Sequence, residues 1–177
     1  TTGSSMNIWN ARDHSFSYSS KRSVSILIYS DMAEIFKPET FPFEKRYKYA
    51  HMKPADIELW ERFIKEFPEM YDSVQYDVPV GEGPMFDTLI TEETGAHDER
   101  LYKRKIDVVG FKKDEIDIIE VKPKAGSSAI GQVLMYRNLY IKDYKPPKYP
   151  KCVIITDTIS NDVADFAASS EIQMVVV

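Results

Sequence analysis

The sequence contains one cysteine, Cys152, among its 177 residues, and only three histidines. A single cysteine excludes an internal disulfide and suits a reducing compartment. The histidines, His14, His51 and His97, are isolated and show no metal-ligand spacing, so no role is assigned to them. No apolar run approaches the roughly 18 to 20 residues that span a bilayer, and no signal-peptide pattern follows Met6. We therefore expect a cytoplasmic, intracellular protein with no membrane partner.

The length of the chain is that of a single domain with a substantial hydrophobic core. We interpret residues 1–5, TTGSS, as a vector-derived remnant, and residues 6–50 as an N-terminal β-rich extension packed on a core at residues 51–177. Aromatic and basic residues interleave over residues 41–49, FPFEKRYKY. This pattern suits either a stacking surface for bases or structural packing. Packing is favoured because aromatic side chains most often serve burial.

Charge is distributed unevenly along the sequence. The net charge of −5 argues against a general nucleic-acid-binding protein. Residues 100–151, however, contain 13 Lys or Arg against 6 Asp or Glu. A surface that follows a phosphate backbone requires such an excess, although lysines at turns can also serve solubility alone.

A β-hairpin is predicted inside this basic region. Two runs of strand character, residues 105–111 and 116–122, flank the polar turn KKDE. Pairing across the turn places Asp107 opposite Glu120, with Cβ atoms about 5 Å apart, where like charges destabilise a sheet unless a cation lies between them. Alternation along the second strand puts Lys122 on the same face as Glu120. The hairpin therefore predicts a site for a divalent cation, with solvent-facing carboxylates softened by nearby lysines as the alternative.

A helix is predicted directly after the hairpin. Ser127 or Ser128 is a plausible N-cap, and residues 129–142 contain no proline. Gln132 and Tyr136 lie four residues apart and thus on one face of this helix, which is otherwise apolar. An amide in the middle of an apolar face requires a hydrogen-bond partner.

These features resemble the PD-(D/E)XK nucleases, and within them the RecB-like branch. The residues that carry the resemblance are Asp107, the ExK element Glu120-Val121-Lys122 and the QxxxY element Gln132 and Tyr136. The resemblance covers roughly residues 58–177. Ile106 stands where the family usually has a proline, which removes no ligand. The single cysteine excludes the four-cysteine iron–sulfur cluster of some RecB-like nucleases.

The resemblance implies a metal-dependent nuclease, acting on DNA by exonuclease or endonuclease cleavage. It implies that Asp107, Glu120 and the Val121 carbonyl hold Mg²⁺ or Mn²⁺, and that Lys122 activates the attacking water. Gln132 and Tyr136 would then orient the site and contact the DNA backbone. The residues expected to bind nucleic acid are Lys105, Lys124, Arg137 and Lys142.

A further carboxylate is expected from a helix that starts near Pro54 and ends before Pro68. In RecB-like enzymes a glutamate of this helix often reaches the metal. Glu61 matches that position better than Glu58, because it lies closer to the edge of the apolar face. An ordinary solvated flank is the alternative for either glutamate.

The remaining pattern predicts an α/β fold. Strands are expected at residues 73–80, 152–156 and 172–177, with a short helix at residues 161–168. This order favours a mixed β-sheet flanked by helices, as in a restriction-endonuclease-like core.

Two other functions fit the same pattern. One is a nucleic-acid-binding accessory protein that keeps the nuclease fold without turnover, and the other is an interaction protein whose basic region docks an acidic partner. The carboxylate pair disfavours both, because a scaffold without turnover has no chemical use for it. The oligomeric state stays open, as does membership of a replication, repair or phage complex.

Overall fold

The computed structural model describes residues 38–82 and 103–177, and the described residues belong to one compact unit that begins at Pro38. The strands are β1 (Thr40–Pro42), β2 (Ser73–Val80), β3 (Arg104–Lys112), β4 (Glu115–Val121), β5 (Lys151–Thr156) and β6 (Ile172–Val176). The helices are α2 (Pro54–Glu66), α3 (Ser127–Tyr144) and α4 (Asn161–Ser169). Of the β-rich extension expected at residues 6–50, residues 6–37 lie outside the described residues.

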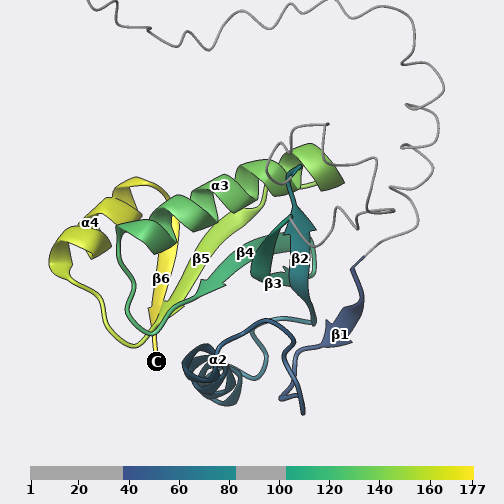
Figure 1. Ribbon diagram of the computed structural model, residues 1–177, viewed down its shortest axis with the longest axis horizontal. Coiled ribbons are helices and arrows are strands. Elements are labelled where there is room, and N and C mark those ends of the chain that lie inside the picture. Colours follow the sequence, from purple (N-terminus) through teal and green to yellow (C-terminus); the bar gives the residue numbers. More distant parts are fainter. Residues whose placement is uncertain (1–37, 83–102) are drawn as a thin grey trace, which may run out of the picture. The chain divides into compact units, whose positions relative to one another are not determined.

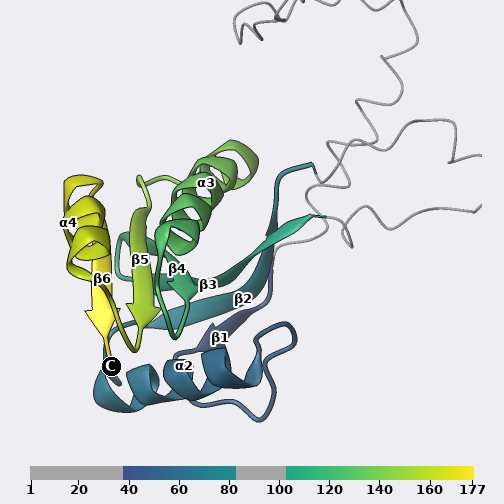
Figure 2. The same ribbon diagram turned by 60° about the vertical axis from the view of Figure 1, so that its left-hand side comes forward.

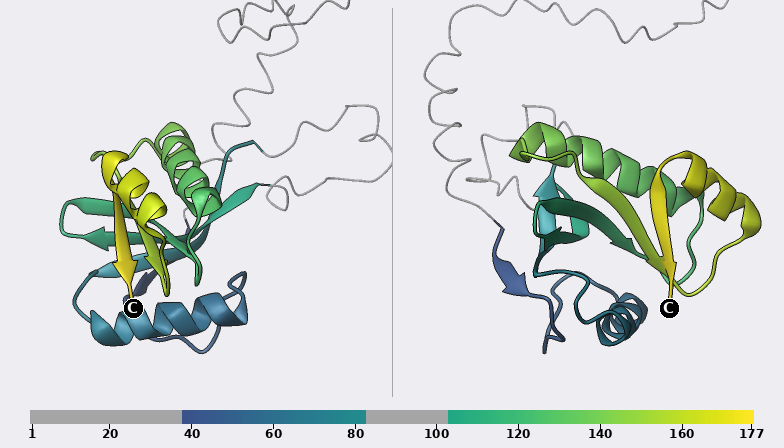
Figure 3. Two further views of the ribbon diagram at one scale, coloured as in Figure 1. Left: turned by 90° about the vertical axis from the view of Figure 1, so that its left-hand side faces the viewer. Right: turned by 180° about the vertical axis from the view of Figure 1, so that it is seen from behind.

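The six strands form one mixed sheet in the order β1-β2-β3-β4-β5-β6 (Figure 1). Neighbours from β1 to β4 are antiparallel, whereas β4, β5 and β6 run parallel to one another. Helices α3 and α4 cover one face of the sheet, and α2 covers the other (Figures 2 and 3). The predicted α/β architecture, a mixed sheet flanked by helices, is therefore confirmed.

Two buried layers hold the helices to the sheet. The layer under α3 and α4 is largely aliphatic and includes Ile118, Val133 and Ile154. The layer under α2 is rich in aromatic residues, where the rings of Trp60 and Phe63 stack with centroids 5.4 Å apart. No helix of the described residues is long and apolar enough to span a membrane.

The hairpin of β3 and β4 has the predicted register. Phe111 pairs with Ile116, and Val108 pairs with Ile119. The turn is tighter than expected, because the strands extend to Lys112 and Glu115 and leave two residues between them. The regular ladder ends at the Val108–Ile119 pair, one position before the two carboxylates.

Strand β2 changes sides in its middle. Val74 and Tyr76 pack in the layer under α2, whereas Val78 and Val80 pack in the layer under α3. Residues two apart in a regular strand share a face, so the alternation is interrupted between Tyr76 and Val78. Asp77 lies at this point with φ of 53°, a left-handed conformation that non-glycine residues rarely adopt.

Strand β3 changes sides at the matching position. Val108 packs in the layer under α2 and Ile106 packs in the layer under α3. Both residues pair with β2, and Asp107 between them is opposite Asp77 without a ladder pair of its own. The two strands therefore bend together, and Asp107 lies at the bend instead of on a regular strand face.

Candidate active site

The side chain of Asp107 contacts strand β4, which contains Glu120 and Val121. The backbone N–H of Val121 donates a hydrogen bond to Asp107 Oδ2 at 3.0 Å. Val121 is the central residue of the ExK element. The Asp107 side chain therefore holds the end of β4 at a point where the backbone ladder between β3 and β4 has already ended. The structure thus brings the predicted Asp107 and the Glu120-Val121-Lys122 element together.

Glu120 is buried without a full set of partners. Only 3% of its surface is exposed, and its Oε2 atom has no hydrogen-bond partner. Burial raises the pKa of Glu120, and the negative charge of Asp107 raises it further, while Lys122 acts in the opposite direction. An ionised carboxylate in this position is uncompensated, because removing a charge from water is costly unless an opposite charge is close.

Asp107 is in a similar environment. Burial is the main cause that raises the pKa of Asp107, and the negative charges of Asp56 and Asp77 add to it. The hydrogen bond from Val121 and the positive charge of Lys122 lower this pKa but do not cancel the rise. Full ionisation of these carboxyls would therefore give the site more negative than positive charge.

Asp56 is a member of the site that the sequence analysis did not identify. It is half-buried in the first turn of α2, and its charge acts on both Asp107 and Glu120. Its Oδ2 also accepts a long hydrogen bond, 3.4 Å, from the backbone N–H of Lys53 at the start of the helix. The only signal in the sequence was its place in a helix-starting segment, which equally indicates a capping residue.

Glu61 lies elsewhere on the same helix. Its carboxylate forms an ion pair with Lys45 at 2.6 Å. It does not contribute to the raised pKa of Asp107 or Glu120. Helical periodicity located the flank of the apolar face but not the end of the helix that meets the strands. Asp56 is therefore the α2 carboxylate whose charge acts on Asp107 and Glu120, whereas Glu61 is paired with Lys45.

Gln132 and Tyr136 contact each other on α3, as their spacing predicts. Gln132 Nε2 donates a hydrogen bond to the Tyr136 hydroxyl at 3.3 Å. Tyr136 is buried in the layer under α3, together with Ile118. By strand alternation Glu120 is on the same side of β4 as Ile118. The QxxxY pair and Glu120 therefore share one side of the sheet.

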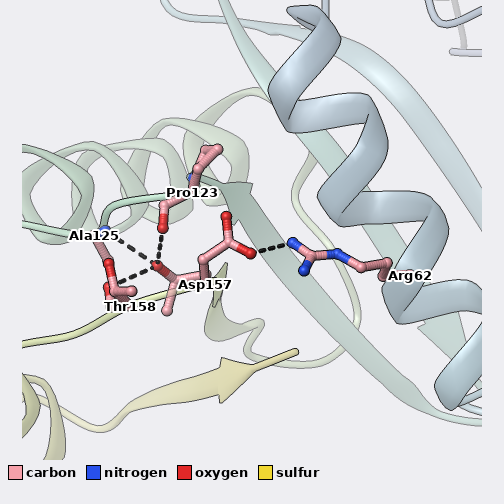
Figure 4. Close-up of polar contacts among 6 residues, drawn as sticks. Arg62, Pro123, Ala125, Asp157 and Thr158 are labelled. Atoms are coloured by element: carbon pink, nitrogen blue, oxygen red, sulfur yellow. Dashed lines mark hydrogen bonds and ion pairs between the residues drawn. The ribbon is translucent and has the colours of Figure 1, made fainter.

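A network of polar contacts fixes the loop that carries Lys122 into α3 (Figure 4). The buried Thr156 Oγ1 accepts a hydrogen bond from the Ala125 N–H at 3.1 Å. The same hydroxyl lies 3.1 Å from the Pro123 carbonyl and 3.0 Å from the Thr158 carbonyl, and it can donate to one of them at a time. The Lys122 N–H donates to the Ile155 carbonyl at 2.9 Å.

An ion pair on the α2 side of the sheet supports the same turn. Arg62 of α2 contacts Asp157, the residue that follows β5 (Figure 4). The Asp157 N–H donates to the Pro123 carbonyl at 3.0 Å. The loop after the ExK element is therefore tied to β5 and, through Asp157, to α2.

The four residues expected to bind nucleic acid lie in different surroundings. Lys105 Nζ is within hydrogen-bond distance of His51 Nε2, and Lys124 is exposed just after the ExK element. Lys142 forms an ion pair with Glu82 at 2.8 Å. The Arg137 guanidinium lies 5.0 Å from the ring centre of Tyr149, which precedes the amino end of β5. Lys105 is two residues before Asp107 on β3, and Lys124 is two residues after Lys122 in the connection to α3, whereas Arg137 is at the opposite end of the parallel strands.

The donor set suits a hard divalent cation. In residues 38–82 and 103–177, no group of three or more His, Cys, Asp or Glu side chains is arranged to hold a metal ion. Asp107, Glu120 and a main-chain carbonyl would leave the other positions to water, which Mg²⁺ usually retains. The unpaired Glu120 Oε2 and the raised pKa of both carboxyls are the features that a bound cation would compensate.

No protein-family model matches the chain, and no curated protein matches its sequence. Among solved structures, it is similar to a repair endonuclease from Pyrococcus abyssi, with 15% identity and a TM-score of 0.42, over 75% of this chain and 49% of that chain. It is also similar to an EndoMS–dsDNA2 complex, with 12% identity and a TM-score of 0.42, over 75% of this chain and 48% of that chain. The chain thus spans about half the length of these proteins, and a likeness this distant does not fix its activity.

Proposed function

We propose that this protein is a nuclease of the RecB-like PD-(D/E)XK type, which hydrolyses phosphodiester bonds of DNA with Mg²⁺ or Mn²⁺ as cofactor. The observation that carries the proposal is the buried Glu120 carboxylate, with its unpaired Oε2 and with Asp107 as a negatively charged neighbour. Burial raises the proton affinity of both carboxylates, and the charge of Asp107 raises that of Glu120 further. Such a desolvated pair destabilises a fold, so their joint presence suits a cation site.

The chain's own groups have distinct roles in this proposal. Asp107 and Glu120 would hold the cation together with the Val121 carbonyl, and Asp56 would add negative charge from α2. A bound divalent cation neutralises charge on a phosphate and lowers the pKa of water. The Val121 N–H orients Asp107, so the ligand side chain is held before a cation arrives.

Lys122 is the positive group of the site. Its charge acts on both Asp107 and Glu120, and its backbone is held by the Ile155 carbonyl. A lysine ammonium in this position can stabilise negative charge that develops on the phosphate and can position the attacking water. Gln132 and Tyr136 would position the phosphate from α3, and Lys105 and Lys124 would contact the DNA backbone.

A cleavage assay tests the proposal. The protein is incubated with linear duplex, circular duplex and single-stranded DNA, each with Mg²⁺, Mn²⁺ or EDTA. We expect cleavage of at least one substrate with either cation and none in EDTA. Products from circular DNA would identify an endonuclease, and cleavage confined to linear or single-stranded DNA would identify a requirement for ends or single strands. Cleavage that persists in EDTA, or no cleavage of any substrate, would refute the proposal.

A further inference from the structure

The connection between β1 and α2 forms a small closed loop. Phe43 and Tyr49 are both buried in the layer under α2. Between them, the Arg46 N–H donates a hydrogen bond to the Tyr49 hydroxyl at 3.0 Å. This contact closes the chain on itself and leaves Tyr47 and Lys48 at the tip, where both side chains are exposed.

The Tyr47 ring is the exception in this aromatic segment. Its relative exposure is 106%, compared with 8% for Phe43 and 7% for Tyr49. Packing on the core therefore explains the presence of Phe43 and Tyr49 but not that of Tyr47. The ring of Tyr47 therefore packs on no part of the described chain and is accessible to a ligand.

The base of the loop is held firmly. The Arg46 guanidinium lies 3.4 Å from the ring centre of Phe41 and 5.6 Å from that of Tyr76. The Tyr49 ring contacts the Tyr76 ring edge to face, with centroids 5.3 Å apart. Cation–π and aromatic contacts at both ends hold the loop, so the tip is presented by a fixed support.

The same segment leads directly to the candidate active site. Tyr76 precedes Asp77, the residue opposite Asp107 at the bend of β2 and β3. Burial raises the pKa of Asp77, and interactions with His51 and Lys105 lower it, so both groups are close to Asp77. After Tyr49 the chain enters α2 (Figure 2), and the first turn of this helix contains Asp56. The loop is thus supported by residues that adjoin the carboxylates.

We propose that Tyr47 stacks on an unpaired base of a single-stranded nucleic acid, while Lys48 contacts the adjacent phosphate. This inference rests on the proposed nuclease function and adds a substrate class, a strand with at least one unstacked base. Every base has a π-face, so an exposed ring binds single strands with little sequence preference. A neighbouring cation is the usual companion of such a ring. A paired base in a duplex does not offer its face in this way.

The test compares three variants in binding to a fluorescently labelled single-stranded oligonucleotide in EDTA. Tyr47→Ala should weaken the Kd about tenfold, since stacking on one base contributes about 1–3 kcal/mol. Tyr47→Trp should bind as tightly as the parent, because a larger ring keeps the stacking. Tyr149→Ala is the matched control, since Tyr149 is also exposed but precedes the amino end of β5, and it should bind like the parent. An oligonucleotide with 2-aminopurine should show quenching with the parent that Tyr47→Ala loses.

The outcomes separate this inference from the nuclease proposal. Equal affinity of parent and Tyr47→Ala, or an equal loss with Tyr149→Ala, would refute stacking by Tyr47 even if the parent cleaves DNA with Mg²⁺. A tenfold loss with Tyr47→Ala in a protein that never cleaves would support stacking and refute the nuclease proposal. A parent that neither binds single strands nor cleaves DNA would refute both.

Discussion

The backbone N–H of Val121 is hydrogen-bonded to Asp107 Oδ2 at 3.0 Å, at the position where the ladder between β3 and β4 has ended. Asp107 therefore has a structural contact in addition to its proposed role as a ligand. Asp107→Asn keeps an acceptor for Val121 and removes a buried charge, so its melting temperature in EDTA should equal or exceed that of the parent. Asp107→Ala removes the acceptor and should be less stable than Asp107→Asn by about 1 kcal/mol. An Asp107→Asn protein that melts well below the parent would show that the ionised carboxylate stabilises the fold.

The raised pKa values predict how stability depends on pH without metal. The pKa of Asp107 and of Glu120 is higher in the folded protein than in the unfolded chain. Between the unfolded and the folded pKa values, the native state therefore binds more protons than the unfolded state. Stability from these groups is present at acid pH and is lost as the pH rises through the folded pKa values. Melting temperatures in EDTA should therefore fall from about pH 4, near the ordinary pKa of these carboxyls, to about pH 8, the folded pKa of Glu120.

Two comparisons check this assignment. Glu120→Gln should flatten the decline in EDTA, because it removes one of the two titrating groups. Mg²⁺ binds the ionised form and should raise the parent's melting temperature most at the alkaline end. A parent whose stability rises with pH in EDTA, or a Glu120→Gln slope equal to that of the parent, would be inconsistent with a buried, uncompensated pair.

Thr156 holds the loop after the ExK element through its hydroxyl. Thr156→Val keeps the shape of the side chain but leaves the buried Ala125 N–H without its acceptor. We expect a loss of about 1–3 kcal/mol in stability, together with slower cleavage because the chain after Lys122 is less firmly held. Thr156→Ser retains the hydroxyl and should restore cleavage. Chemical denaturation measures the stability of the two variants, and a cleavage assay measures their activity. Equal cleavage rates for Thr156→Val and Thr156→Ser would show that the network does not support the site.

Gln132 and Tyr136 test the RecB-like assignment in particular. Tyr136→Phe removes the acceptor of the Gln132 amide, and Gln132→Ala removes its donor. Neither residue is a proposed metal ligand, so each variant should slow cleavage about tenfold or more and change metal affinity less. Metal titrations of the cleavage rate distinguish the two effects. Tyr140→Phe, a buried tyrosine on the same helix, is the control and should cleave like the parent.

Much of this arrangement could be predicted from local sequence patterns. The hairpin register from Val108 to Phe111 follows from a short polar turn between two apolar runs, but the ladder ends before the predicted pair of Asp107 and Glu120. The helix that carries Gln132 and Tyr136 follows from its spacing and from the absence of proline. Both predictions depend on residues that are close in the sequence.

The rest depends on tertiary contacts that no local pattern contains. Helical periodicity indicates a face, but the choice of Asp56 over Glu61 depends on which end of α2 meets the strands. The bend at Asp77 and Asp107 interrupts the alternation on which strand prediction relies. Tyr47 is exposed between the buried rings of Phe43 and Tyr49, in a loop that a hydrogen bond from Arg46 to Tyr49 closes.

The central claim is that Glu120 takes part in metal-dependent cleavage of DNA. The most direct measurement compares the cleavage rate of Glu120→Gln with that of Glu115→Gln, under the DNA and Mg²⁺ conditions in which the parent cuts. Glu115 begins the same strand, but it is exposed and paired with Lys151 at 2.7 Å. The account predicts that Glu120→Gln loses cleavage by at least about a hundredfold while remaining folded, and that Glu115→Gln cleaves at the parental rate. Parental cleavage by a folded Glu120→Gln protein would contradict it.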